Sequence, residues 1–220
     1  MEQADLSPSG PRHGTTRVLE HPLAAVALSA LRSKSTSTDV FRSNLQRLSV
    51  LLLAEASRRW PTAAMEVETP LRSCEGAAFA RPVVLVPILR AGLGMLDGML
   101  RVLPDARVGH LGLYRDEATL RPVTYYSRLP KDLAEAEVLL LDPMLATGHS
   151  ASAAASILKQ EGARSVGFVC VVACPAGIAQ LTGAHPDISI TTAAVDPELN
   201  GVGYIVPGLG DAGDRYFGTG

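Results

Sequence analysis

From residue 83 onward, apolar residues gather into five short runs rich in Val, Ile and Leu. The runs lie at residues 83–88, 108–113, 138–141, 166–173 and 188–195. Near-continuous apolar strands indicate a sheet that is buried on both faces, and such sheets are usually parallel. Because helical patterns separate the runs, the sequence predicts an α/β fold with a parallel sheet flanked by helices.

Between and after these runs, the spacing of apolar residues and helix stop signals predict three helices. They cover residues 92–103, 150–161 and 176–184. Parallel strands are joined by right-handed crossovers, and the ligands of such sheets bind outside the carboxyl ends of the strands. We therefore expect functional residues in the loops that follow the strands.

The N-terminal third has a different pattern. A short helix opens at His21-Pro22, and a Ser/Thr cluster ends it. Thr38 or Asp39 is predicted to cap a second helix. Apolar residues on the second helix follow the i, i+4, i+7, i+11 spacing of one buried face. They are Phe41, Leu45, Leu48 and Leu52. Residues 60–80 contain prolines and mixed signals, which predict an extended arm or a hairpin.

Length and composition fit one folded domain. The chain has 220 residues, of which 47% are hydrophobic and 19% charged, so it can bury a substantial core and is not globally disordered. We divide this single domain, 1–220, into a loose tail, an N-terminal region of helices and arm, a core and a C-terminal segment. Their ranges are 1–15, 16–80, 81–198 and 199–220.

Charge and hydropathy limit the partners of the protein. A formal net charge of −2 gives no sign of a nucleic-acid partner. The apolar runs are shorter than the roughly 20 residues of a membrane-spanning helix, and the polar N-terminus lacks the apolar stretch of a signal peptide. The sequence predicts a cytoplasmic protein that binds neither nucleic acid nor membrane.

The three cysteines argue against a disulfide framework, because their number is odd. Cys170 and Cys174 fall within or beside an apolar run and are predicted to be buried thiols. No cluster of His or Cys accompanies them, so a metal–thiolate site is not expected.

The stretch VLLLDPMLATGHS, residues 138–150, carries the most specific chemistry. An apolar strand ends in Asp142, and a short loop with Thr147 and Gly148 enters a helix at Ser150. Unpaired N–H groups and the dipole at a helix N-terminus favour a phosphate, and the two hydroxyls add donors. No GK[ST] and no G-x-G-x-x-G follows this strand. Taken alone, the pattern fits an ordinary capped strand-to-helix turn equally well.

This arrangement resembles the phosphoribosyl diphosphate motif of type I phosphoribosyltransferases. Three more blocks accompany it: VPILRAGLGMLDG, GLYRDEATLRPVTYY and LNGVGYIVPGLGDAGDRYFGT, at 86–98, 112–126 and 199–219. In this order and spacing the blocks resemble the uracil phosphoribosyltransferase family, from about His21 to the C-terminus. The resemblance implies a type I phosphoribosyltransferase-like fold with a C-terminal base-binding hood. It also implies a pentosyltransferase of pyrimidine salvage, which converts uracil and phosphoribosyl diphosphate into UMP and diphosphate.

The resemblance assigns most strand-end residues to phosphoribosyl diphosphate. It implies that Arg90 and Arg115 bind the diphosphate, that Asp142 bonds the ribose hydroxyls and that 146–150 hold the 5′-phosphate. Residues 117–126 would be a flexible flap over the site. The complete implied set is Arg90, Arg115, Asp142, Pro143, Met144, Leu145, Ala146, Thr147, Gly148, His149, Ser150 and Asp211.

The C-terminal block resembles the family's uracil pocket. Uracil presents two carbonyl acceptors beside one N–H donor, and backbone amides alone can match them. The implied pocket residues are Ile205, Gly210, Asp211 and Ala212. Asp211 would lie near the diphosphate and its Mg²⁺, and the implied catalytic set is Asp142, Arg115 and Asp211. Because Mg²⁺ prefers phosphate oxygens and water, no direct protein ligand is expected. Tyr204 and Phe217 are interpreted as packing residues.

One position departs from the family's pattern. The family usually has two glycines after Thr147, whereas this chain has Gly148 followed by His149. If residue 149 needs a positive φ, the histidine is strained by about 1 kcal/mol or more. If it has ordinary helix-entry angles, its imidazole is free to approach the 5′-phosphate, a neighbouring subunit or solvent.

Three other functions fit the sequence less well. A purine or orotate phosphoribosyltransferase shares the core but not the C-terminal block. A non-catalytic, pyrimidine-sensing regulator that binds RNA needs a basic face, which the charge pattern does not supply. A dehydrogenase needs a nucleotide fingerprint that is missing. The family resemblance further implies a homodimer or homotetramer and GTP as a candidate effector.

Overall fold

The computed structural model describes residues 14–115 and 122–220, without the side chains of Arg115 and Pro122. Its main sheet has eight strands in the order β1-β12-β10-β8-β4-β6-β7, with β5 paired to β4. All neighbouring strands are parallel except β6 and β7. The strands are β1 (Thr16–Val18), β4 (Val83–Leu89), β5 (Arg107–Val108), β6 (His110–Arg115), β7 (Pro122–Arg128), β8 (Glu137–Leu141), β10 (Ser165–Val169) and β12 (Ser189–Thr192).

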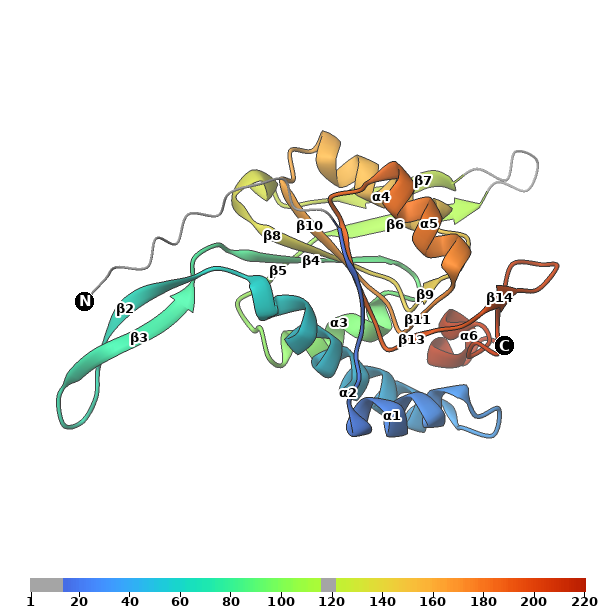
Figure 1. Ribbon diagram of the computed structural model, residues 1–220, viewed down its shortest axis with the longest axis horizontal. Helices are drawn as coiled ribbons and strands as arrows, with labels where there is room; N and C mark the ends of the chain where they lie inside the picture. Colours follow the sequence, from blue (N-terminus) through green and yellow to red (C-terminus); the bar gives the residue numbers. More distant parts are fainter. Residues whose placement is uncertain (1–13, 116–121) are drawn as a thin grey trace.

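Helices cover both faces of this sheet, as the apolar runs predicted (Figure 1). One face packs against α4 (His149–Gln160) and α5 (Pro175–Ala184), and the other against α1 (Pro22–Arg32), α2 (Thr38–Ala56) and α3 (Leu93–Leu100). Side chains alternate along the central strands between the two cores. Val84 and Val86 of β4 face the first core and Leu85 the second, and all three are fully buried.

Three of the five predicted strands are broken in the structure. The runs at 108–113, 166–173 and 188–195 each divide into two strands, whereas the other two runs form β4 and β8. In two cases the second piece joins a separate parallel sheet, in the order β13-β11-β9. Its strands are β9 (Met144–Leu145), β11 (Val172–Ala173) and β13 (Ala194–Val195). Hydropathy does not mark these breaks, because the sequence stays apolar through the run from β10 to β11.

The N-terminal helices form as predicted, with one correction. The apolar stripe of α2 is buried, and His21 caps α1 by accepting a hydrogen bond from the Leu23 N–H at 3.1 Å. The residue that precedes α2 is Ser37 rather than Thr38 or Asp39. Thr38 already has helical geometry, because the first backbone bond of the helix joins the Phe41 N–H to the Ser37 carbonyl at 2.8 Å.

The predicted arm is an antiparallel hairpin of β2 (Thr62–Glu68) and β3 (Ser73–Phe79), which projects away from the sheet (Figure 1). Two strands of the main sheet, β1 and β7, were not predicted. Strand β1 has only three residues and is largely exposed, so it leaves no apolar run. The other is β7, which pairs with β6. Residues 122–126 of the predicted flap lie in β7, and 117–121 are outside the described residues.

Of the predicted tail, the structure describes only Gly14 and Thr15. The Gly14 N–H bonds to the Pro186 carbonyl at 2.5 Å, and the Thr15 carbonyl accepts from the Ile190 N–H at 3.0 Å, so both residues continue the edge of the sheet. Among the helices within 14–115 and 122–220, none is long and apolar enough to span a membrane.

Two short 3-10 turns and three C-terminal elements complete the fold. They are η1 (Ser57–Arg59), η2 (Leu133–Glu135), β14 (Glu198–Leu199), β15 (Ile205–Val206) and α6 (Ala212–Phe217). Cys170 and Cys174 are buried free thiols, which confirms that prediction, and burial raises the pKa of Cys170 to about 12.

Candidate functional site

Residues from three of the four predicted site blocks (86–98, 138–150 and 199–219) meet at the carboxyl edge of the sheet, where the short strands and α6 lie (Figure 1). A pocket of about 220 Å³ forms there between three segments that are far apart in the sequence. Its walls are Ala91, Met144, Ala146, Gly203, Tyr204, Ile205, Gly210, Asp211, Ala212 and Gly213. Residues assigned to the phosphoribosyl group therefore share one pocket with residues assigned to the base.

Gly92 allows two of these segments to touch. A Cβ at this position would lie 2.4 Å from the Leu141 carbonyl oxygen and 2.7 Å from backbone atoms of Ile88. No side chain fits there without moving backbone. The turn after β4 is therefore packed directly against the end of β8, which brings the Arg90 segment beside Asp142.

Asp142 lies at the end of β8, partly exposed, with the core behind it. Its carboxylate accepts one hydrogen bond, from the Met144 N–H at 3.3 Å. Burial raises the pKa of the Asp142 carboxyl to about 7, and the Met144 bond opposes this shift. Desolvation penalises the charged form, and no cation among the described residues compensates it here. Hydrogen bonds donated by ligand hydroxyls would stabilise the charged form of this carboxylate.

The loop that follows Asp142 ends at a left-handed residue. Gly148 has φ 78° and precedes the first helical residue of α4. A Cβ on it would lie 2.6 Å from the Gly177 carbonyl oxygen, and one on Gly177 would lie 2.4 Å from the carbonyl oxygens of Leu145 and Ala146. Both glycines are needed for the loop to lie against the start of α5. The first N–H groups of α4 remain without intrahelical partners and face outward.

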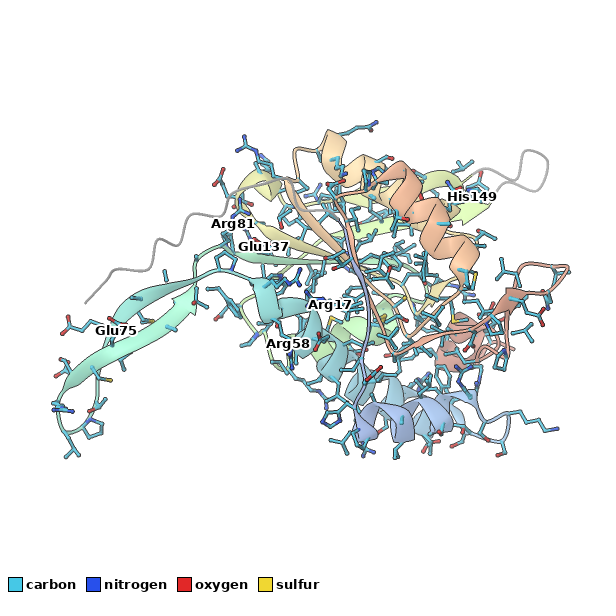
Figure 2. All side chains as sticks on the ribbon, in the orientation of Figure 1. Arg17, Arg58, Glu75, Arg81, Glu137 and His149 are labelled. Carbon is cyan, nitrogen blue, oxygen red and sulfur yellow. The ribbon has the colours of Figure 1, made fainter. Side chains whose placement is uncertain are left out.

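The position of His149 decides between the two readings of the departure from the family's pattern. His149 is the first residue of α4, and the left-handed conformation falls on Gly148 instead. The histidine therefore has helix-entry geometry and is not strained. Its side chain is exposed at the end of α4 (Figure 2).

His149→Gly should retain the fold and most of the activity, because the left-handed glycine of the loop is unchanged. If a protonated His149 contacted the 5′-phosphate, KM for phosphoribosyl diphosphate would rise with pH in wild type and not in His149→Gly. We expect matching pH profiles for the two proteins between pH 5.5 and 8, since the side chain is exposed. A rise in KM confined to the wild type would establish the phosphate contact.

The C-terminal segment is a folded loop built on its own backbone. Strands β14 and β15 pair antiparallel, and the Asn200 side chain accepts from the N–H groups of Val202 and Tyr204 at 3.1 and 2.9 Å. Gly208 and Gly210 have φ of 55° and 76°, which other residues rarely adopt. The loop thus holds its backbone polar groups in fixed directions beside the pocket.

Asp211 lies at the pocket wall and caps α6. One oxygen accepts from the Asp214 N–H at 2.9 Å, and the other is 3.4 Å from the Tyr204 hydroxyl. The negative charge of Asp211 raises the pKa of Tyr204. Tyr204 also lines the pocket, beside Asp211. Phe217 does pack, edge-on against Tyr216 at 5.0 Å.

The two predicted diphosphate-binding arginines lie at strand ends. Arg90 follows β4, is 59% exposed, and donates to Asp214 Oδ1 at 3.3 Å. An ion pair this exposed contributes little stability, so an incoming diphosphate can replace it. Arg115 is the last residue of β6, opposite Pro122 of β7, and its side chain lies outside the described residues.

Comparison with known proteins shows the family of the chain. A family model described as uracil phosphoribosyltransferase matches residues 18–219. The chain belongs to the uracil phosphoribosyltransferase family.

Relatives in the uracil phosphoribosyltransferase family match nearly end to end. A uracil phosphoribosyltransferase of Dictyoglomus turgidum is 54% identical over 203 residues, covering 92% of this chain and 98% of the relative. One of Lactiplantibacillus plantarum is 50% identical over 207 residues, covering 94% and 99%. A solved structure of an Aquifex aeolicus protein superposes with a TM-score of 0.88 at 37% identity, over 93% of this chain and 99% of that one.

The fold extends beyond the uracil phosphoribosyltransferase family. A hypoxanthine phosphoribosyltransferase of Staphylococcus aureus superposes with a TM-score of 0.50 at 12% identity, over 72% of this chain and 76% of that one. This likeness confirms the predicted phosphoribosyltransferase fold and carries nothing about the base.

Sequence reasoning missed several residues of the pocket region. Ala91, Gly203 and Gly213 line the pocket but were not assigned to the base, since small residues leave no chemical signal. Arg32 and Asp196 bind each other and Gly208, in the loop at 203–213 that we call the base loop. They lie 164 positions apart in the sequence, and no sequence pattern joins them. A larger cavity of about 420 Å³ lies at the amino ends of the strands, and none of the predicted site residues lines it.

Proposed function

We propose that the protein transfers the phosphoribosyl group of 5-phospho-α-D-ribose 1-diphosphate to N1 of uracil, which gives UMP and diphosphate. Family membership over nearly the whole chain supports this reaction. The single observation that carries it is the shared pocket, in which the Met144–Ala146 loop faces the base loop at 203–213.

The shape of the pocket fits a small base. Its volume of about 220 Å³ is below the roughly 300–1,000 Å³ typical of sites for drug-sized ligands. Gly203, Gly210 and Gly213 line it and have no side chains, so they offer backbone atoms to it. Backbone N–H and C=O groups in fixed directions supply the alternating donors and acceptors that uracil matches.

In the proposed mechanism, N1 of uracil attacks the anomeric carbon as the bond to diphosphate breaks, with inversion, and the N1 proton passes to solvent. The ring carbon becomes positive in an oxocarbenium-like transition state, so no protein nucleophile is needed. Asp142 orients the ribose by accepting from its hydroxyls, and the 146–150 loop holds the 5′-phosphate. Arg90 and Arg115 neutralise the leaving diphosphate, which lowers the barrier by positioning and by charge stabilisation.

The residues of the site fit Mg²⁺ that is bound mainly through substrate. Among the described residues, no group of three or more His, Cys, Asp or Glu side chains is arranged to hold a metal ion. Asp211 is the carboxylate that lines the pocket, and Mg²⁺ accepts one or two carboxylates with phosphate and water oxygens. When bound with diphosphate, Mg²⁺ neutralises part of its charge.

Asp142 makes the reaction depend on pH. Its folded pKa of about 7 lies above the ordinary 3.8, so the carboxylate form predominates only above pH 7. We expect kcat/KM for phosphoribosyl diphosphate to rise as pH increases through 7 and then to level off. Asp142→Asn should be slower and should lack this step when kcat/KM is measured between pH 5.5 and 8.5.

The same pKa shift predicts a stability effect of opposite sense. A carboxyl with a raised folded pKa binds its proton more tightly in the folded state, so the free energy of unfolding falls as pH rises from about 4 to 7. Asp142→Asn should therefore raise Tm at pH 8 and leave it nearly unchanged at pH 4. A lower Tm for Asp142→Asn at pH 8 would contradict the buried-carboxylate account.

The choice of base distinguishes the proposed uracil activity from the activities of purine and orotate phosphoribosyltransferases. With phosphoribosyl diphosphate and Mg²⁺ present, diphosphate release should depend on uracil and should be absent with hypoxanthine, adenine or orotate. Turnover of a purine or of orotate would assign the chain to another specificity. A regulator would instead bind RNA and release no diphosphate with any base.

We also propose that the protein forms a homodimer or homotetramer. Apolar side chains remain exposed on the arm and on α1; they are Leu23, Val26, Met65, Leu71 and Phe79. Light scattering of the purified protein tests the assembly. GTP as an effector rests on the family resemblance, and the uracil assay with and without GTP tests it.

A further inference from the structure

The end of helix α1 is tied to the chain just before the base segment by a bidentate ion pair. The two guanidinium nitrogens of Arg32 donate to the two carboxylate oxygens of Asp196, each at 2.7 Å. The Asp196 side chain is only 7% exposed. Burial alone would raise the pKa of Asp196, but hydrogen bonds from Arg32 and Gly208 hold that pKa below its ordinary value.

This pair holds both backbone polar groups of one residue in the base loop. The Gly208 N–H donates to Asp196 Oδ2 at 2.8 Å, and the Gly208 carbonyl accepts from Arg32 Nη1 at 2.8 Å. Gly208 itself has φ 55°, and a Cβ on it would lie 2.1 Å from the Ile205 carbonyl oxygen. The loop is thus fixed at the point midway between Ile205 and Gly210, which both line the pocket.

A second arginine repeats the connection one residue further along. Arg215 of α6 donates to the Leu209 carbonyl at 2.7 Å and to the Ser33 carbonyl at 2.6 Å, just after α1. Its guanidinium lies 4.5 Å from the centroid of the Phe41 ring. Gly208 and Leu209, successive residues of the loop at 203–213, are therefore both connected to α1 or to the residue that follows it.

None of Arg32, Asp196 and Arg215 lines the pocket, so they act on the base through the loop. A pocket that recognises its ligand with backbone groups discriminates only as well as those groups are held in place. If the loop can rotate, a backbone N–H can turn away from a mismatched base, and that base then binds with a smaller loss of free energy. Buried ion pairs are weak sources of net stability, and a role in fixing one arrangement is their better-attested use.

We propose that Arg32 and Asp196 are positioning residues that set base specificity, by holding the 205–210 backbone in its uracil-selective arrangement before the base binds. The inference rests on the proposed function and adds to it the source of its specificity. We call the Arg32–Asp196 pair and its two bonds to Gly208 the clamp. Removing the clamp should weaken discrimination between bases, while the phosphoribosyl site, which is built from other segments, stays largely intact.

Asp196→Asn is the principal test, because it keeps the shape and removes the charge. Losing a charge-assisted contact should raise KM for uracil about tenfold or more, while KM for phosphoribosyl diphosphate changes by less than about threefold. The ratio of kcat/KM for uracil to that for cytosine should fall by at least about tenfold. Arg32→Lys, which keeps the charge but loses the fork, should lie between wild type and Asp196→Asn in both quantities.

Glu137→Gln is the matched control. Glu137 is also a buried carboxylate paired with an arginine, Arg81, at 3.1 Å, but it lies at the amino end of the sheet (Figure 2). Both substitutions are expected to lower Tm, whereas only Asp196→Asn should change KM for uracil. Equal effects of the two on KM and on the base ratio would reduce the pair to a general stabilising contact and overturn the inference.

Calorimetric binding of UMP and CMP gives a readout that does not need turnover. Wild type should prefer UMP strongly, and Asp196→Asn and Arg32→Lys should narrow the preference. An unchanged preference in either folded variant, with an active wild type, overturns the inference and leaves the proposed function intact. A wild type that forms no UMP defeats the proposed function, and one that does not prefer UMP over CMP defeats both.

Discussion

Cytosine should be a worse substrate than uracil by about 10⁴-fold in kcat/KM. It carries an amino donor where uracil has its 4-carbonyl, and an unprotonated N3 where uracil has an N–H. In a pocket of fixed backbone groups this sets donor against donor and acceptor against acceptor, and the buried groups stay unpaired. The glycine-rich wall at 203–213 and the clamped loop leave little freedom to adjust.

The matched control is 5-fluorouracil, which keeps the acceptors and the donor of uracil and changes only C5. Its kcat/KM should lie within about 200-fold of that for uracil, since one small substituent in a pocket changes binding by about 1–3 kcal/mol at most. Comparable kcat/KM for cytosine and uracil would mean that backbone hydrogen bonds do not select the base.

Arg115→Ala should lower kcat/KM by about 2–4 kcal/mol, or roughly 30- to 1,000-fold, without loss of the fold. Arg115 ends β6 at the carboxyl edge, where the phosphoribosyl site is proposed. Removing a charge-assisted contact to a departing diphosphate affects the transition state most, so kcat should fall along with kcat/KM.

Arg128→Ala is the control for that substitution. Arg128 lies on the same hairpin, opposite His110, at the end of β7 away from the carboxyl edge. It should behave as wild type in steady-state kinetics and in Tm. Wild-type kinetics from Arg115→Ala, or equal losses from both variants, would remove Arg115 from the site.

The sequence predicts the layers of this fold because burial on both faces leaves long apolar runs. It does not predict where those runs break, since the residues between β10 and β11 are as apolar as the strands themselves. Those breaks matter, because β9, β11 and β13 pair in a separate sheet, and Met144 of β9 lines the pocket. Strand β1 was missed for the opposite reason: it is short and exposed, and the edge of the sheet defines it.

In the site, sequence motifs indicate the residues proposed to contact ligands. The residues that hold the loops of the site in place are found only from the structure. The 138–150 motif and the C-terminal block contain Asp142 and Asp211, each placed at the carboxyl edge by a strand or helix end. Arg32 and Asp196 carry no motif and come together only when α1 packs under the base loop. The angle at Gly148 likewise needed the structure to show that His149 is unstrained.

Product analysis of the purified protein tests the central claim most directly. Incubation with uracil, phosphoribosyl diphosphate and Mg²⁺ should yield UMP and diphosphate in equal amounts, as followed by mass spectrometry and phosphorus NMR. Omission of either substrate should abolish both products. A folded protein that binds uracil and phosphoribosyl diphosphate but forms no UMP would contradict the account and favour a sensor on the same scaffold.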